Sequence, residues 1–158
     1  MIHLHLIVVG KLKEGYWREA EAEYLKRLSS SSQITFHEIK EEPFSEKDPV
    51  EMIKEKEGKK ILEILEKIRD NFVVALEEKG KQFSSVQFAK NLSNWSSLSH
   101  STTFIIGGPL GLSRNVISKT NMTLSLSPLT FTHQMARVIL LEQIYRAMMI
   151  TQNRKYHH

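Results

Sequence analysis

Apolar residues follow two patterns along the chain, short continuous or alternating runs and longer runs with helical spacing. The short runs predict five strands, at residues 2–9, 34–39, 72–76, 102–106 and 122–126. Spacing of three or four residues predicts five helices, at residues 16–28, 50–68, 84–95, 113–120 and 133–150. Strands and helices alternate strictly, and this order predicts an α/β fold with a mainly parallel sheet flanked by helices. No repeat or change of composition divides residues 1–158, so we expect a single domain.

The ends of two predicted helices carry further information. Ser84, followed three residues later by Gln87, resembles a capping box that starts the third helix. The last helix is apolar on more than one face, through Val138, Ile139, Leu141, Ile144, Tyr145, Met148 and Met149. Because one sheet covers only one side of a helix, a partner subunit is the simplest cover for the other side. We therefore expect a symmetric homodimer.

Composition narrows the class of protein. With 41% hydrophobic and 25% charged residues, the chain resembles an ordinary soluble globular protein. It has no cysteine, which excludes disulfides, a thiolate nucleophile and cysteine-ligated metals. There is no signal peptide and no apolar run long enough for a membrane span, so we expect a cytoplasmic protein without a membrane segment. The net charge of +4 favours an anionic partner, although surplus lysine also serves solubility.

Three strand-to-loop junctions are candidates for a ligand site. The turn Gly107–Gly111 follows the fourth strand, and Leu76–Gly80 and Leu126–Phe131 follow two others. The glycine turn is not a dinucleotide fingerprint, and Gly10-Lys11 lacks the rest of a phosphate-binding loop. Alone, the glycine turn would indicate only a tight connection. Three such junctions together favour a cradle for a small ligand, because backbone groups at strand ends are free to bind it.

The histidines and the C-terminal tail are weaker signals. His3 and His5 share a strand face, but no third ligand is in reach, so we expect no metal site. His133 begins a helix, where capping or packing is its ordinary role. Glu142 and Arg146 have the spacing of a structural ion pair. The final residues, Arg154–His158, combine cations, imidazoles and a tyrosine, and could form either a frayed tail or a functional one.

Several short motifs occur in one order along the chain. They are Val8–Lys13, Lys56-Glu57-Gly58, Leu76–Gly80, Phe104–Gly108, Leu124–Ser127, Thr130–His133, Arg137-Val138, Glu142–Ala147 and Tyr156-His157. With this order, length and C-terminus, the chain resembles the SPOUT-class ribosomal RNA large subunit methyltransferase H family over its full length. The resemblance implies a C-terminal trefoil knot, with the knot and the cofactor loops within about residues 72–158.

The resemblance also implies S-adenosyl-L-methionine as cofactor, held by three loops of the knot. Carried over by position, the cofactor-binding residues are Leu76, Gly107, Leu126, Ser127, Pro128, Leu129, Thr130 and Phe131. Backbone groups in such loops can bind the edge of the adenine, and leucines can sandwich its ring.

The implied reaction is methylation of the N3 nitrogen of a pseudouridine in large-subunit ribosomal RNA, within the assembled ribosome. The cofactor supplies the electrophile, so the protein has to position, desolvate and deprotonate the substrate. Tyr156 and His157 are the candidate catalytic residues, on a tail of the same or the other subunit that closes over the cofactor. Phosphate contacts are expected from basic residues such as Arg114, Lys119, Arg154 and Lys155.

Two positions depart from the family pattern, and two alternative functions have to be considered beside the one that the resemblance implies. Thr132 stands where the family commonly has proline, and His158 stands where it commonly has a final basic residue. One rival is a knotted RNA-binding protein without catalysis, which the intact cofactor-loop residues argue against. The other is a SPOUT enzyme that acts on tRNA. Such enzymes often carry an added RNA-binding domain, for which this chain is too short.

Overall fold

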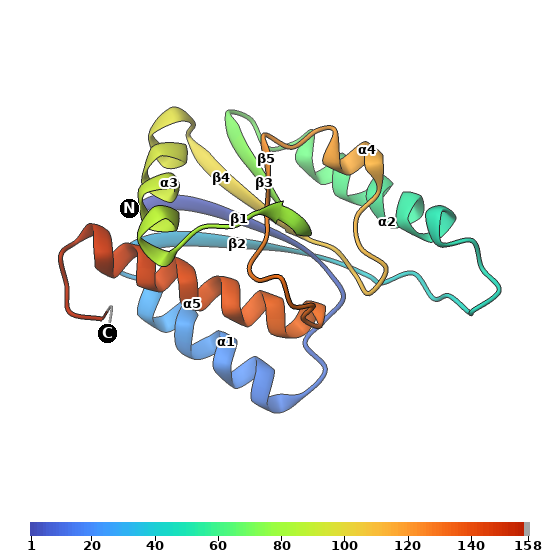
Figure 1. Ribbon diagram of the computed structural model, residues 1–158, viewed down its shortest axis with the longest axis horizontal. Helices are drawn as coiled ribbons and strands as arrows, with labels where there is room; N and C mark the ends of the chain where they lie inside the picture. Colours follow the sequence, from blue (N-terminus) through green and yellow to red (C-terminus); the bar gives the residue numbers. More distant parts are fainter. Residues whose placement is uncertain (157–158) are drawn as a thin grey trace.

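The computed structural model describes residues 1–156, which form strands and helices in the predicted alternating order (Figure 1). Their bounds are β1 (Ile2–Val9), α1 (Gly15–Leu28), β2 (Ser32–Ile39), α2 (Val50–Leu65), β3 (Asn71–Lys81), α3 (Ser85–Leu98), β4 (Ser101–Ile106), α4 (Arg114–Ile117), β5 (Met122–Leu124) and α5 (His133–Thr151). The predicted capping box is present, since the Ser84 hydroxyl accepts from the Gln87 backbone and the Gln87 side chain accepts from the Ser84 backbone. In this part of the chain, no helix combines the length and apolarity needed to cross a membrane.

The five strands form one sheet with the order β2-β1-β4-β3-β5, in which every neighbouring pair is parallel. The predicted α/β fold with a parallel sheet is therefore confirmed. Since the strands all run the same way, their carboxyl ends lie at one edge of the sheet. The ends of β4, β3 and β5 are next to one another there, although these strands are far apart in the sequence. The trefoil knot stays a prediction of the family resemblance.

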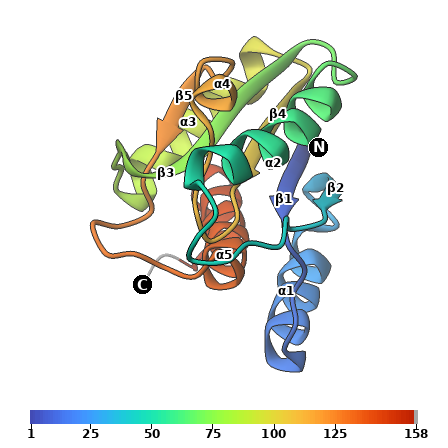
Figure 2. The ribbon, with the colours of Figure 1, turned by 90° about the vertical axis from the view of Figure 1, so that its right-hand side faces the viewer.

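Helices cover both faces of the sheet, with α1, α3 and α5 on one face and α2 and α4 on the other (Figures 1 and 2). The side chains of β1 point alternately to the two faces of the sheet, so this strand contributes to the hydrophobic core on each face. Leu4, Leu6 and Val8 pack against the first set of helices, whereas Ile7 and Val9 pack against the second. Strands buried on both faces explain why β1 reads as a nearly continuous apolar run.

Predicted boundaries were wrong by two or more residues at the ends of three helices and at one end of three strands. Helix α3 continues to Leu98, and β2 already begins at Ser32. Helices α2 and α4 end about three residues early, because their last turns tighten into bonds between residues three apart, such as Ile68 N–H to the Leu65 carbonyl. Strand β5 ends at Leu124, and in the loop that follows the Ser125 hydroxyl donates to the Ser127 carbonyl at 2.9 Å. Strand β3 continues to Lys81, because Lys81 pairs with Leu124 again after an irregular excursion.

Helix α5 lies between α1 and α3 on the same side of the sheet (Figure 1). Its apolar residues Val138, Leu141 and Met149 are buried within the chain, and Ile144 is 0% exposed. The sequence argument overlooked these two helices, which cover part of α5 within the chain, whereas Ile139, Tyr145 and Met148 are only partly buried. The homodimer itself stays a prediction.

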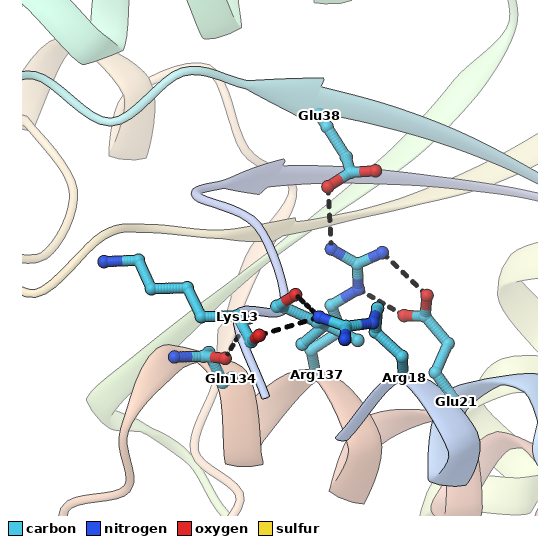
Figure 3. A network of polar contacts seen from close by, with 7 residues as sticks. Lys13, Arg18, Glu21, Glu38, Gln134 and Arg137 are labelled. Atoms are coloured by element: carbon cyan, nitrogen blue, oxygen red, sulfur yellow. Dashed lines mark hydrogen bonds and ion pairs between the residues drawn. The ribbon is translucent and has the colours of Figure 1, made fainter. Parts of the chain in front are cut away.

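Arg137 attaches the beginning of α5 to the rest of the fold (Figure 3). Its guanidinium is paired with Glu21 of α1 through two hydrogen bonds, one of them 2.9 Å long, and lies 3.4 Å from the Glu38 carboxylate of β2. It also lies 4.6 Å from the centre of the Phe36 ring. Arg137 is only 5% exposed and so requires such partners, since an unpaired buried charge is strongly destabilising. The start of α5 is thereby held in one position directly after the 125–132 loop.

Candidate active site

Of the eight residues predicted to bind the cofactor, Leu76 lies within β3, at its last regular pair with β5, and the other seven come after β4 and β5. Gly107 directly follows β4, and Leu126–Phe131 follow β5. Since the strand order is β4-β3-β5, the three predicted cofactor loops start side by side at the carboxyl edge. This edge is where open parallel sheets bind ligands.

Glycines allow two of these loops to pack closely. A side-chain carbon added at Gly107 would lie 3.0 Å from the carbonyl carbon of Gly111 and 3.0 Å from the Leu112 side chain. The Gly111 N–H donates to the Gly108 carbonyl at 3.0 Å, so the loop folds back on itself. At Gly80 the added carbon would lie only 2.7 Å from the Leu124 backbone. Both glycines are needed for these backbone approaches.

The loop after β5 has internal bonds and an exposed tip. The Leu129 N–H donates to the Ser127 hydroxyl at 3.0 Å. Leu129 itself is 73% exposed, and its neighbours Pro128 and Thr130 are also exposed. An exposed leucine at the tip of a loop suits a surface that a ligand would cover.

Two glutamates that were not predicted as site residues connect this loop to the others. Adjacent side chains of an extended segment point in opposite directions. Accordingly, Glu78 accepts a hydrogen bond from the Thr130 hydroxyl, whereas Glu77 lies near the Leu112 backbone. Burial raises the pKa of Glu77, and the nearby Lys54 charge and the Leu112 backbone oppose that rise. The Glu-Glu pair directly after an apolar strand was the sequence signal for these residues.

Removing the contact between Glu78 and Thr130 is expected to weaken cofactor binding. We expect Glu78→Gln or Thr130→Val to lower S-adenosylmethionine affinity by about fivefold, the scale of one partly exposed hydrogen bond. Isothermal titration measures this change, and Lys79→Gln, at the exposed next position, is the matched control. Equal affinities for all of these proteins would show that the contact does not hold the loop for binding.

A groove lies beside one of the predicted residues. It has a volume of about 210 Å³ and is lined by Phe83, Ser85, Phe88, Leu124, Ser125, Leu126, Ile139 and Gln143. Only Leu126 belongs to the predicted cofactor set. Gln143 donates to Glu142 at 2.5 Å, and Glu142 also accepts from the Tyr156 hydroxyl at 3.5 Å. Polar contacts thus connect the groove to the C-terminal tail.

Tyr156 lies against the middle of α5. Its ring meets the Tyr145 ring edge-on, with the ring centres 4.7 Å apart, and the Arg146 guanidinium carbon lies 4.9 Å from its centre. The predicted ion pair between Arg146 and Glu142 is confirmed, with a distance of 2.7 Å. Burial, and then a hydrogen bond to Tyr24, raise the pKa of Tyr156. At neutral pH the phenol therefore stays protonated and can donate a hydrogen bond.

The structure does not bring Tyr156 to the cofactor loops of its own chain. Its contacts are with Glu142, Tyr145 and Arg146 of α5, and none is with one of the eight predicted cofactor residues. His157, the second candidate catalytic residue, lies outside the described residues.

Other predicted residues have simpler positions. Thr132 caps α5, because its hydroxyl accepts from the Met135 N–H, so it replaces the proline of the family pattern with a favourable N-cap. Arg114, Lys119, Arg154 and Lys155 are exposed. His5 lies 3.1 Å from His37, a neighbour that the sequence did not reveal. Within residues 1–156, no three metal-binding side chains converge.

Comparisons with known proteins agree with this arrangement. A family model described as predicted SPOUT methyltransferase matches residues 2–157. The putative ribosomal RNA large subunit methyltransferase H of Methanoregula boonei is 44% identical over 160 residues, which are 99% of each chain. The ribosomal RNA large subunit methyltransferase H of Bacillus cytotoxicus is 45% identical over 161 residues, again 99% of each chain. Among solved structures, a probable methylase family protein from Haemophilus influenzae matches with a TM-score of 0.55 and 12% identity, over 95% of this chain and 66% of that one.

Proposed function

Because the chain belongs to the SPOUT methyltransferase family, we propose that it methylates the N3 nitrogen of a pseudouridine in large-subunit ribosomal RNA. The observation that carries this proposal is the meeting of three loops at one edge of the sheet, where the eight expected cofactor residues lie. Relatives of the same length and 44% identity are named as ribosomal RNA methyltransferases. Ribosomal RNA as substrate also places the protein in the compartment of the ribosome, the cytoplasm.

The residues at this edge fit S-adenosylmethionine as the methyl donor. Gly107 lets its loop fold closely against Gly111 and Leu112 at the end of β4, and Leu126 and Leu129 offer apolar surface for an adenine ring. When bound, S-adenosylmethionine supplies a methyl group on a positively charged sulfur. The chain's own contribution is to position the substrate, exclude water and accept or share the N3 proton.

The residues of the C-terminal tail have different proposed roles in this reaction. Tyr156, with its raised pKa, acts as a hydrogen-bond donor to the substrate, since its phenol is protonated at neutral pH. His157 is the candidate for the group that takes the N3 proton, because imidazole titrates near neutral pH. His158 carries no fixed charge, so Lys155 and Arg154 would supply the positive charge of the tail.

We further propose that the protein is a homodimer whose tail serves the site of the other subunit. The contacts of Tyr156 within its own chain are with α5, at Glu142, Tyr145 and Arg146, and none is with a predicted cofactor residue. Light scattering at micromolar concentration tests the dimer. A substitution at Ile139 would probe the dimer interface better than one at Ile144. Ile139 is partly buried and borders the open groove, whereas Ile144 is fully buried within its own chain.

The deciding experiment uses large ribosomal subunits and assembled ribosomes from a strain that lacks the gene. Incubation with the protein and labelled S-adenosylmethionine, followed by mass spectrometry of the RNA, should place one methyl group on a pseudouridine N3. Methylation of tRNA instead would identify the rival SPOUT activity. Ribosome binding without any S-adenosylmethionine binding in a titration would identify an RNA-binding protein without catalysis.

A further inference from the structure

The segment Lys11–Arg18, between β1 and the first turn of α1, combines basic and aromatic side chains at the surface. Lys11, Lys13 and Arg18 are exposed, and Tyr16 is 63% exposed. Trp17 is partly buried and meets Tyr16 edge-on, with the ring centres 5.1 Å apart. The segment contributes three cations and one acid, Glu14.

The backbone of this segment is fixed by side chains from both directions. The Arg18 guanidinium donates to the carbonyls of Leu12 at 3.1 Å and Lys13 at 2.7 Å. From α5, the Gln134 side chain accepts from the Lys13 N–H at 2.8 Å (Figure 3). Leu12 is 7% exposed and anchors the segment between the two lysines. A surface with an ordered backbone loses less conformational entropy on binding than a free loop does.

The two lysines are directed outward and are available to an anion. Leu12 points inward, so the alternation of an extended segment puts Lys11 and Lys13 on the outward side. In Figure 3 the Lys13 side chain extends away from the Arg137 network. Within residues 1–156, neither lysine is among the ion-paired cations, unlike Lys54 and Lys60.

The segment adjoins the candidate active site. A side-chain carbon at Gly10 would lie 2.9 Å from Nε2 of His133, the first residue of α5 and the second after Phe131. Gln134, which binds Lys13, is the next residue. Figure 1 shows the connection from β1 to α1 and the loop that enters α5 on the same side of the molecule.

We propose that the Lys11–Arg18 segment is an RNA-docking surface, on which Lys11 and Lys13 contact phosphates and Tyr16 stacks on an unpaired base. This proposal rests on the proposed function and adds a contact surface to it. Charge complementarity favours RNA, because exposed cations interleaved with an exposed aromatic ring match a phosphate backbone with splayed bases. The bound strand would be one that flanks the target nucleotide, since the segment lies beside the cofactor loops.

The test measures binding separately from methyl transfer. Sedimentation with unmethylated large ribosomal subunits would compare wild type with the double variant Lys11→Ala/Lys13→Ala and with Tyr16→Ala. We expect the double variant to bind about tenfold more weakly and its dependence of log affinity on log salt to flatten by about two. Tyr16→Ala should bind roughly five- to a hundredfold more weakly, the range of a lost stacking contact.

Matched controls separate docking from general effects. Lys26→Ala removes an exposed cation from the far end of α1, and Leu98→Ala removes an exposed apolar side chain from α3. Both should bind like wild type, and every variant should keep the melting temperature and S-adenosylmethionine affinity of wild type. Wild-type binding by the double variant and by Tyr16→Ala would overturn the proposal.

Two further outcomes have distinct meanings. If the variants lose affinity for ribosomal subunits but not for protein-free ribosomal RNA, the surface contacts a ribosomal protein and the RNA proposal is wrong. If wild type binds subunits through this segment but transfers no methyl group, the proposed function fails while the docking surface stands.

Discussion

Deleting Tyr156–His158 is expected to reduce methyl transfer to ribosomes by about a hundredfold or more, the scale of a lost acid–base or hydrogen-bonding group. S-adenosylmethionine affinity should change little, because the proposed role of Tyr156 and His157 is toward the substrate nitrogen and not toward the cofactor. The melting temperature should fall slightly, since the Tyr156 ring packs on Tyr145 and Arg146. Single-turnover methylation, titration and calorimetry measure these three quantities.

Single substitutions show how much of the lost methyl-transfer rate is due to Tyr156 and how much to His157. Tyr156→Phe keeps the ring contacts and removes only the hydroxyl that donates to Glu142, so a reduced rate with unchanged stability would indicate a chemical role. His157→Ala should reproduce much of the loss caused by the deletion. A truncated protein that methylates ribosomes at the wild-type rate would show that neither residue is catalytic.

Gly80→Ala is expected to lower the free energy of unfolding by about 3 kcal/mol, the upper range for overpacking a tight site. The new carbon would lie 2.7 Å from one Leu124 backbone atom and 2.8 Å from the Ser125 nitrogen, and backbone cannot rotate away as a side chain can. The displacement would strain the 3.0 Å hydrogen bond from Ser125 N–H to the Lys81 carbonyl, next to the cofactor loop. S-adenosylmethionine affinity should therefore fall as well.

Gly15→Ala is the matched control for this substitution. Its added carbon would lie 3.7 Å from the end of the Arg18 side chain, at the first residue of α1. Alanine at that position should leave stability unchanged or raise it slightly, because alanine favours helix over glycine. Denaturant unfolding compares the two variants. Equal stabilities would mean that β3 and β5 tolerate a wider separation than their contacts suggest.

Parts of the candidate site could be recognised before the fold was known, and others could not. Gly107 and the run Leu126–Phe131 directly follow apolar strands, so local sequence marks them as loop residues at strand ends. Glu77 and Glu78 look like ordinary surface charges in the sequence. Their contacts with Leu112 and Thr130 depend on the lateral order of the strands, which no local pattern contains.

The sequence by itself determined the alternation of strands and helices and the parallel character of the sheet, because the periodicity of apolar residues directly reflects local geometry. The apolarity of α5 did not reveal its two neighbouring helices, and the partner subunit that it suggested stays a prediction. Only the tertiary structure decided that α1 and α3 cover this helix, that β3 lies between β4 and β5, and that Arg137 reaches Glu21 and Glu38. These facts are contacts between residues distant in the chain, set by packing and by the pairing of buried charge, and not by the local preferences that sequence patterns record.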